Sequence, residues 1–275
     1  MRILLAVSVV ALSLGCSRGV RLDSAVAGMK PATGKVYSNE AGEQVTIIPL
    51  EPHDSKKALL EFNGTKSELD GKVVIASVDR DRGTGYWTKW RGRTQRFVTV
   101  HDRGGFEDLI LSPAGASGYT HLKPDTGRTA ALKVEKVFAR YEDAEEDGDL
   151  KPFIGFDRKF WTDQAEKELG ENLAEANKAC GTKMAATIAW DTIPDPVLNE
   201  LSVPSYCAGP LESLQKLCAR SEEAKRTVQQ KVQTVECRVD AAAALKLEAQ
   251  KVIWTVKSGE TIQPDATTTF FTDNL

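Results

Sequence analysis

Short segments in which apolar and polar residues alternate fill the chain from about residue 34 to residue 141. Alternation with a period of two is the pattern of a half-buried β-strand, and turn sequences rich in Gly, Pro, Asn or Asp separate the segments. Eight segments carry this pattern: residues 44–50, 57–64, 70–79, 84–90, 93–101, 105–113, 117–124 and 129–141. Strands at this spacing predict an all-β sandwich or barrel for residues 34–141.

The hydrophobic period becomes helical in the second half of the chain. Apolar residues recur every three to four positions from Trp161 to Ala176, which predicts a helix over about 158–179, ended by Gly181. Further elements are expected in this order: a strand over 184–193, a loop over 194–206, a helix from Pro210, a helical run through Val228, and a hairpin of two strands over 232–240 and 244–256. Residues 153–275 are therefore predicted to form a second, smaller α+β domain.

A strongly acidic segment separates the two patterns. Residues 141–149, YEDAEEDGD, contain six acidic side chains and no basic one, and such a charge run is expected to be solvated. The expected fold class is therefore α+β, with a β-rich domain over 34–141, an acidic linker over 142–152, and the α+β domain after it.

The N-terminus has the pattern of a secretory signal peptide. Arg2 is followed by thirteen uncharged residues, ILLAVSVVALSLG, a run too short to span a bilayer as a helix. Residues 1–15 are therefore predicted to be a signal peptide. Residues 16–33 contain scattered Gly, Ser and Pro without a hydrophobic period, which predicts a flexible tether.

The end of this run resembles the lipobox of bacterial lipoproteins, whose form is Leu, a small residue, Gly or Ala, then Cys. The four residues here are Ser13, Leu14, Gly15 and Cys16, so Gly15 and Cys16 match and Ser13 stands where Leu is usual. The resemblance implies cleavage after Gly15 and attachment of acyl chains such as palmitate to Cys16, which gives stable membrane binding. Ser17, rather than Asp, implies sorting to the outer membrane. The alternative is an ordinary signal peptide that ends near a cysteine.

The other cysteines support export. Cys180, Cys207, Cys218 and Cys237 form an even set, and disulfides persist in the periplasm and at cell surfaces, so two bridges are expected. Four cysteines allow three pairings. We favour Cys180–Cys237 and Cys207–Cys218, with the chain folding back between the second pair. A zinc site is disfavoured because no CxxC pair exists and no His follows His121.

Composition and motifs narrow the function. The chain has 275 residues, 41% of them hydrophobic, and a net charge of −3, which indicates a globular protein and gives no reason to expect a nucleic-acid partner. No HExxH, GxSxG or SxxK motif occurs and no cofactor is expected. The three histidines are His53, His101 and His121. The alternative to a binding protein is an envelope hydrolase that uses His101 and Asp102.

Two weaker candidate sites remain. Asp143, Glu145, Asp147 and Asp149 fall at positions 1, 3, 5 and 7 of a calcium loop, but position 12 is Ile154, which cannot ligate calcium. We therefore expect no metal site and read the segment as a solvated linker.

The second candidate is a strand rich in aromatic and basic residues over 85–97. Trp87, Trp90, Arg91 and Arg93 could bind a polyanion or a glycan by stacking and charge, but an ordinary half-exposed hairpin is the favoured interpretation. The sequence thus predicts an exported lipoprotein of the cell envelope, anchored through Cys16 in the outer membrane. Its expected role is to bind an envelope protein or glycan, or to serve as a structural component, without catalysis.

Overall fold

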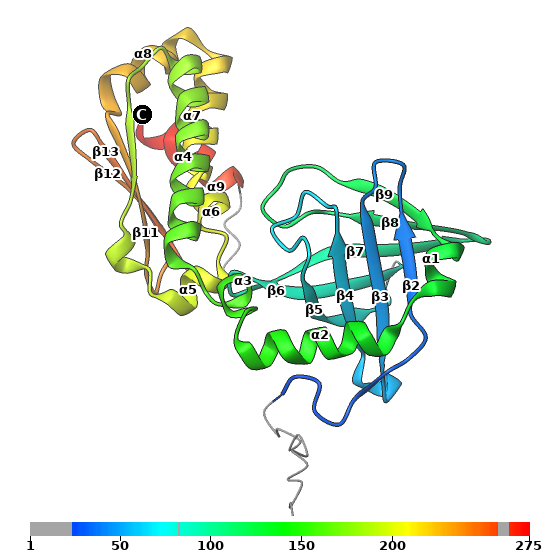
Figure 1. Cartoon of the computed structure of the whole chain (residues 1–275). Coiled ribbons are helices and arrows are strands. Elements are labelled where there is room, and N and C mark those ends of the chain that lie inside the picture. The colour runs from blue at the N-terminus through cyan, green and yellow to red at the C-terminus, as the bar shows by residue number, and fades with distance from the viewer. Residues whose placement is uncertain (1–23, 82, 258–263) are drawn as a thin grey trace, which may run out of the picture. The chain divides into compact units, whose positions relative to one another are not determined.

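A computed structural model describes residues 24–81, 83–257 and 264–275. The chain forms two compact units. Unit 1 comprises Met1–Thr88 and Arg96–Leu150, and unit 2 comprises Lys89–Gln95 and Lys151–Leu275. Each unit has its own sheet (Figure 1). The fold is α+β, and its N-terminal part is a β-barrel.

Unit 1 is built on an eight-stranded up-and-down barrel. Its strands are β2 (Lys35–Ser38), β3 (Gln44–Glu51), β4 (Lys57–Asn63), β5 (Val73–Asp79), β6 (Thr84–Trp90), β7 (Arg93–Arg103), β8 (Phe106–Leu111) and β9 (Thr120–Pro124). They lie around the barrel in chain order, and the pairing of β9 with β2 closes it. A short strand, β1 (Lys30–Pro31), pairs with the end of β3, and a 3-10 turn, η1 (His53–Ser55), connects β3 to β4.

Both faces of β3 and β4 are buried, which explains their nearly continuous apolar sequence. Glu61 on β4 forms an ion pair with Arg140 of the helix outside the barrel, so its face points outward. Leu60 and Phe62 have the opposite orientation, point into the barrel and are fully buried. Val45 of β3 lies directly opposite Phe62 and belongs to the same interior layer.

Two helices follow the barrel: α1 (Thr126–Ala131) and α2 (Val134–Asp147). The prediction of a strand over 129–141 is therefore wrong. The buried residues Val137 and Tyr141 are four positions apart, so their spacing is helical, and the local alternation around Leu132 concealed it. The eighth strand of the barrel is instead β2, which the hydrophobic pattern did not reveal.

The predicted linker and part of the predicted tether are ordered. Residues 142–147 form the end of α2, so the acidic segment is mostly helix. Residues 24–33, expected to belong to a flexible tether, are held against unit 1. The backbone N–H of Ala25 donates to Glu145 Oε1 (3.0 Å), and Lys57 Nζ donates to the carbonyl of Ala25 (3.0 Å). Cys16 and the predicted signal peptide lie outside the described residues.

Unit 2 combines helices with a four-stranded sheet. Its elements are α3 (Lys151–Ile154), α4 (Arg158–Cys180), β10 (Ala185–Ile188), the 3-10 turn η2 (Trp190–Thr192), α5 (Asp195–Glu200), α6 (Val203–Cys207), α7 (Gly209–Arg220), α8 (Glu222–Lys231), β11 (Thr234–Val239), β12 (Ala244–Glu248), β13 (Lys251–Val256) and α9 (Pro264–Asn274). The predicted long helix is confirmed as α4, with Asp157 as its N-cap and Gly181 as its left-handed C-cap. The loop expected over 194–206 contains α5 and α6 instead.

The sheet of unit 2 has the order β10-β11-β13-β12. β11 pairs in parallel with both β10 and β13, and only β12 is antiparallel to its neighbour. The predicted hairpin between 232–240 and 244–256 is therefore wrong: residues 244–256 form a hairpin of their own, with Ala249 in the left-handed region at its turn.

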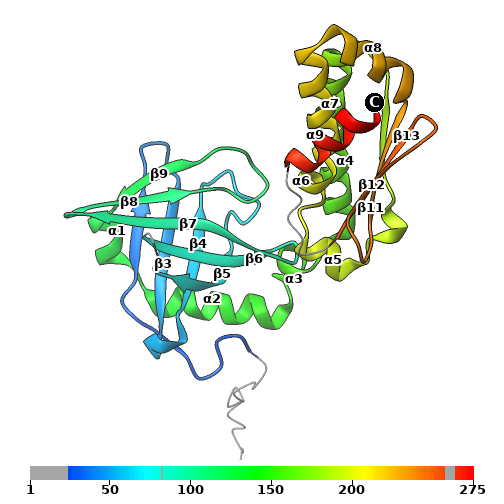
Figure 2. The same cartoon turned by 180° about the vertical axis from the view of Figure 1, so that it is seen from behind.

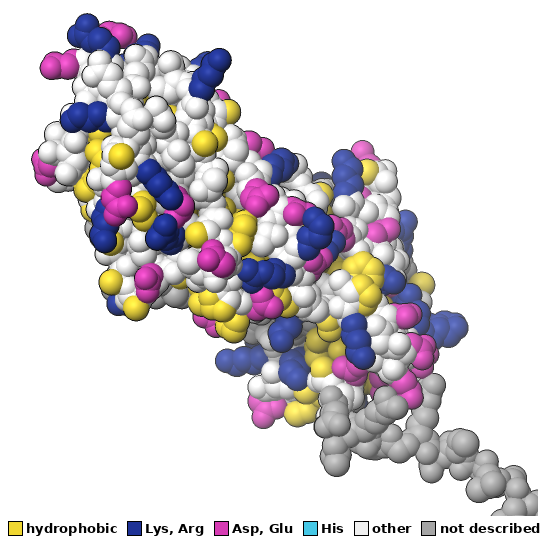
Figure 3. All heavy atoms as spheres, turned by 90° about the vertical axis from the view of Figure 1, so that its left-hand side faces the viewer, with side chains coloured by type: hydrophobic (Ala, Val, Ile, Leu, Met, Phe, Trp, Pro, Cys, Tyr) yellow, Lys and Arg dark blue, Asp and Glu magenta, His cyan; other side chains and the backbone are white. Residues whose placement is uncertain are grey.

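One face of this sheet carries the core of unit 2. Helices cover that face in both views (Figures 1 and 2), and Val235, Val252 and Trp254 are buried beneath them. The opposite face is polar, because Glu236 pairs there with Arg238 and Lys251. In the upper part of Figure 3, basic and acidic side chains lie side by side with small, separate hydrophobic patches. No helix in the described part of the chain is long and apolar enough to cross a membrane.

Candidate functional site

The cysteines form two buried disulfides in unit 2. Cys180 is bonded to Cys218 and Cys207 is bonded to Cys237. Two bridges were predicted, but the favoured pairing of Cys180 with Cys237 and of Cys207 with Cys218 is wrong. The Cα atoms are 5.0 Å apart in the first bridge and 5.5 Å apart in the second, within the range of ordinary disulfides.

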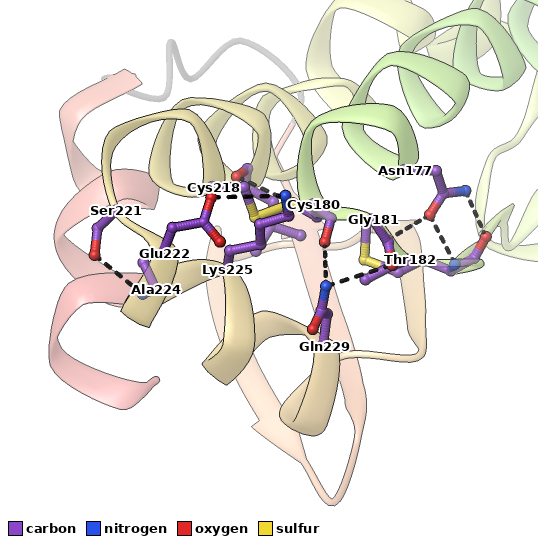
Figure 4. The surroundings of a disulfide bond; sticks show 12 residues. Asn177, Cys180, Gly181, Thr182, Cys218, Ser221, Glu222, Ala224, Lys225 and Gln229 are labelled. Carbon is purple, nitrogen blue, oxygen red and sulfur yellow. Dashed lines mark hydrogen bonds and ion pairs between the residues drawn. A yellow bond between two sulfur atoms is a disulfide. The ribbon is translucent and has the colours of Figure 1, made fainter.

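The helix packing explains this pairing. α4 lies along α7, which brings the C-terminal end of one helix beside that of the other, where Cys180 and Cys218 meet (Figure 4). Gln229 of α8 fixes this corner by donating from Nε2 to the carbonyl of Cys180 (2.8 Å). Cys207 ends α6 and faces the central strand β11, so it bonds to Cys237 there.

The predicted binding residues Trp90 and Arg91 belong to unit 2 and pack against the residues at the start of α4. Trp90 is 5% exposed and packs edge-on against Phe160 and Trp161, with ring centroids 5.1 and 5.5 Å away. Arg91 forms a 2.5 Å ion pair with Asp157, and its guanidinium lies 4.2 Å from the centroid of Phe160. Both side chains are therefore engaged in contacts with residues at the start of α4.

Arg93 is also held inside unit 2. Its guanidinium lies 3.8 Å from the centroid of the Trp161 ring and donates to the carbonyl oxygens of Leu198 and Leu201. Burial lowers the pKa of Arg93, and the charge of Glu168 partly offsets that effect. Trp87 is half-exposed, and the guanidinium of Arg96 lies 5.4 Å from its ring. Trp87 belongs to unit 1, and the other three residues belong to unit 2.

The acidic segment does not form a calcium loop. Asp143, Glu145 and Asp147 lie on α2, where alternate residues point to different sides of the helix, and Asp149 follows its C-cap. Glu145 already accepts bonds from Ser24 and from the backbone of Ala25. No group of three or more His, Cys, Asp or Glu side chains within residues 24–81, 83–257 and 264–275 is placed to hold a metal ion.

The histidines lie on different elements of unit 1. His53 is in η1, His101 in β7 and His121 in β9. His101 and Asp102 are consecutive strand residues, so their side chains point to opposite faces of the barrel wall. Asp102 Oδ1 accepts instead from the backbone N–H of Gly105 in the β7–β8 turn (3.3 Å). The geometry thus gives no support to an acid–base pair of His101 and Asp102.

His121 has the carboxylate partner that sequence reasoning missed. Its Nδ1 atom lies 2.6 Å from Oδ2 of Asp108 on the neighbouring strand β8. Both residues stood in correctly predicted strands, but the strand register that brings them together cannot be read from the hydrophobic pattern. This pair lies on the outer face of the barrel.

A polar cluster occupies one end of the barrel interior. Tyr37 lies opposite Val45, on the inward face of β2, and its hydroxyl donates to Glu107 of β8. Lys35 Nζ lies 2.5 Å from the other oxygen of the same carboxylate. Burial alone would raise the pKa of Glu107, but the bonds from Lys35 and Tyr37 outweigh it and hold the pKa below its ordinary value. Burial, together with Glu107, raises the pKa of Tyr37 well above its usual value.

This cluster predicts acid-sensitive stability for unit 1. Folding lowers the pKa of Glu107, so ionised Glu107 stabilises unit 1 at pH values above the pKa of an unfolded Glu. This stabilisation is lost as the pH falls through the pKa of Glu107 in the folded protein. We expect Glu107→Gln to lower the melting temperature of unit 1 at pH 7. Between about pH 5 and pH 3, the melting temperature of the variant should decrease less than that of the parent protein. Thermal unfolding across this range tests it. Glu51→Gln, at an exposed strand end, is the control, and an unchanged acid profile in Glu107→Gln would contradict the expectation.

Comparisons with protein-family models, with curated proteins and with solved structures found no significant match to this chain.

Proposed function

We propose that the chain is an exported lipoprotein, attached to a membrane of the bacterial cell envelope through acylated Cys16, and that it serves there as a non-catalytic binding or structural component. The tether and the anchor come from the N-terminal sequence, and the two folded units are the parts that would meet envelope partners.

The observation that carries the proposal is the pairing of the cysteines. All four cysteines of unit 2 are joined in two bridges, as expected of a protein that folds in an oxidising compartment. The fifth cysteine, Cys16, is the one that follows the apolar N-terminal run. A lipid anchor gives this remaining cysteine a role, whereas an ordinary signal peptide does not.

The ordered start of unit 1 limits how far it can stand from the membrane. Ser24, the first described residue, lies eight positions after Cys16 in the sequence. A fully extended chain of that length spans at most about 29 Å. Under this proposal unit 1 therefore works close to the lipid surface, while unit 2 is joined to the anchor only through unit 1.

A binding role is favoured over the hydrolase alternative by the geometry of its two candidate residues. The side chain of Asp102 is engaged by the β7–β8 turn, on the face opposite to His101. A hydrolytic pair would require both groups to reach one substrate atom.

Replacing Cys16 with Ala should release the protein from the membrane fraction and abolish its labelling by a radioactive fatty acid, because the acyl acceptor is removed. Ser17→Asp is the matched control: it keeps the cysteine, so labelling should persist while the protein moves from the outer to the inner membrane. Cell fractionation and labelling measure both. Membrane association that is unchanged in Cys16→Ala would overturn the anchor.

A further inference from the structure

A surface pocket lies on the outer face of the barrel, between the β2–β3 turn and β9. Its volume is about 620 Å³. The lining is polar or charged except for one alanine: Ser38, Asn39, Glu40, Ala41, His121 and Lys123. In small-molecule sites, precisely placed polar groups fix the orientation of the ligand.

Asp108 fixes the orientation of the histidine in this pocket. With a proton on Nδ1, the ring of His121 donates to Asp108 over 2.6 Å and leaves Nε2 as a hydrogen-bond acceptor. Ser38 Oγ donates to Asp125 (2.9 Å), so its lone pairs remain as acceptors toward the pocket. Two groups of the lining are thus held in place by neighbours outside it.

The charges in the lining balance. Lys123 supplies ammonium donors and Glu40 supplies carboxylate acceptors, and both side chains are exposed. A site for an anion would carry an excess of cations, and a site for an apolar molecule would carry apolar walls. Closely spaced donors and acceptors without net charge suit a neutral ligand with many hydroxyl groups.

Two exposed aromatic residues lie on the same outer face. Phe106 is 85% exposed and Tyr119 is 69% exposed, and they are the large hydrophobic side chains that stand out to solvent in the described part of the chain. The Tyr119 ring meets His121 edge-on at 5.5 Å. Phe106 has the same strand orientation as Asp108, two positions along β8.

The spacing of these aromatic residues suits an extended chain of sugars. Leu111 at the end of β8 pairs with Thr120, so Phe106 and Tyr119 lie about six strand positions apart, roughly 20 Å. Polar groups of Asp108, His121 and Lys123 lie between them. The buried core of a protein interface is a continuous apolar patch. Here the two aromatic rings are separated by hydrogen-bonding groups, so the face does not resemble such an interface.

We propose that the outer face of β8 and β9 binds an oligosaccharide, with sugar rings stacked on Tyr119 and Phe106 and hydroxyl groups bonded to His121, Lys123 and Glu40. This inference rests on the binding role proposed above and names its ligand class. It is independent of the acylation of Cys16, so failure of one leaves the other standing.

The test uses the full mature protein in a detergent without a sugar headgroup, titrated calorimetrically with two probes, a β-1,4-linked N-acetylglucosamine tetramer and maltotetraose. We expect one tetramer to bind with a Kd below about 10 mM, and Tyr119→Ala and His121→Ala to weaken it about tenfold or more. Tyr119→Phe keeps the ring and should bind as the parent does. Trp87→Ala, an aromatic change outside this face, should also leave binding intact.

Several outcomes would overturn the oligosaccharide site. These are the absence of binding by both tetramers, binding that survives Tyr119→Ala and His121→Ala unchanged, or binding of inorganic phosphate at this pocket in place of the sugars. Capture of a protein through Phe106 and Tyr119 with no sugar binding would reassign the face to a protein partner. Circular dichroism verifies the fold of each variant, and all substituted side chains are at least partly exposed.

Discussion

Phe62→Ala is expected to lower the free energy of unfolding of unit 1 by about 3–5 kcal/mol. Phe62 points into the barrel from β4 and has 0% exposure, and it lies opposite Val45 across the β3–β4 ladder. Removing its ring leaves a cavity that the closed barrel cannot collapse to fill, because each strand is held by hydrogen bonds on both sides. Urea unfolding, monitored by hydrogen exchange of peptides from the barrel, measures the decrease in the free energy of unfolding.

The chain offers a matched control for this substitution. Phe106→Ala makes the same chemical change at a side chain that is 85% exposed, so it should alter the stability of unit 1 by less than about 0.5 kcal/mol. A Phe62 variant as stable as the Phe106 variant would show that Phe62 is not in a packed interior, and the barrel described above would be wrong.

Removal of either disulfide is expected to destabilise unit 2 by about 4 kcal/mol. The bridges close segments of 38 and 30 residues. In the chain-entropy model, loops of that length contribute about 3.6–3.9 kcal/mol each by restricting the unfolded chain. The double variants Cys180→Ala/Cys218→Ala and Cys207→Ala/Cys237→Ala remove one bridge each without leaving a reactive thiol. Denaturant unfolding of the full chain gives the change.

The pairing itself provides the control for that experiment. The mixed double variant Cys180→Ala/Cys237→Ala removes one cysteine from each bridge. It should therefore be less stable than either matched variant and should contain two free thiols. If the mixed variant kept one intact bridge and unfolded like a single-bridge protein, Cys207 would be bonded to Cys218, and the arrangement around α4 and α7 would be contradicted.

The sequence pattern was sufficient for elements with an unmixed hydrophobic period. Seven barrel strands and the long helix α4 follow directly from periods of two and of three to four. The pattern failed where two periods overlap, as around Leu132, where a brief alternation concealed the spacing of Val137 and Tyr141. It also failed for β2, whose four residues are too few to show a period.

Long-range pairing was beyond the sequence for a different reason. Closure of the barrel, the parallel pairing of β11 with β13, and the partners of each cysteine depend on contacts between segments far apart in the chain. The bonds of Cys180 and Cys207 follow from how α4, α6 and α7 pack, and local spacing carries no information about that packing.

The candidate site shows the same limit. Trp90, Arg91 and Arg93 have the composition of a ligand surface, yet the side chains of α4 that bury them lie about seventy residues later in the sequence. The pairing of His121 with Asp108 was not predicted, because the two residues belong to no common motif. Their meeting depends on the register of β8 and β9, which places them on one exposed face.

Intact mass spectrometry of the protein purified from membranes tests the central claim most directly. A lipoprotein should give a chain that begins at Cys16, carries the added mass of a diacylglyceryl group and an N-acyl chain, and gains four hydrogens on reduction as its two disulfides open. A chain that begins at Met1, or one cleaved to leave Cys16 as a free thiol or to remove it, would contradict the lipid anchor and with it the proposed place of this protein in the envelope.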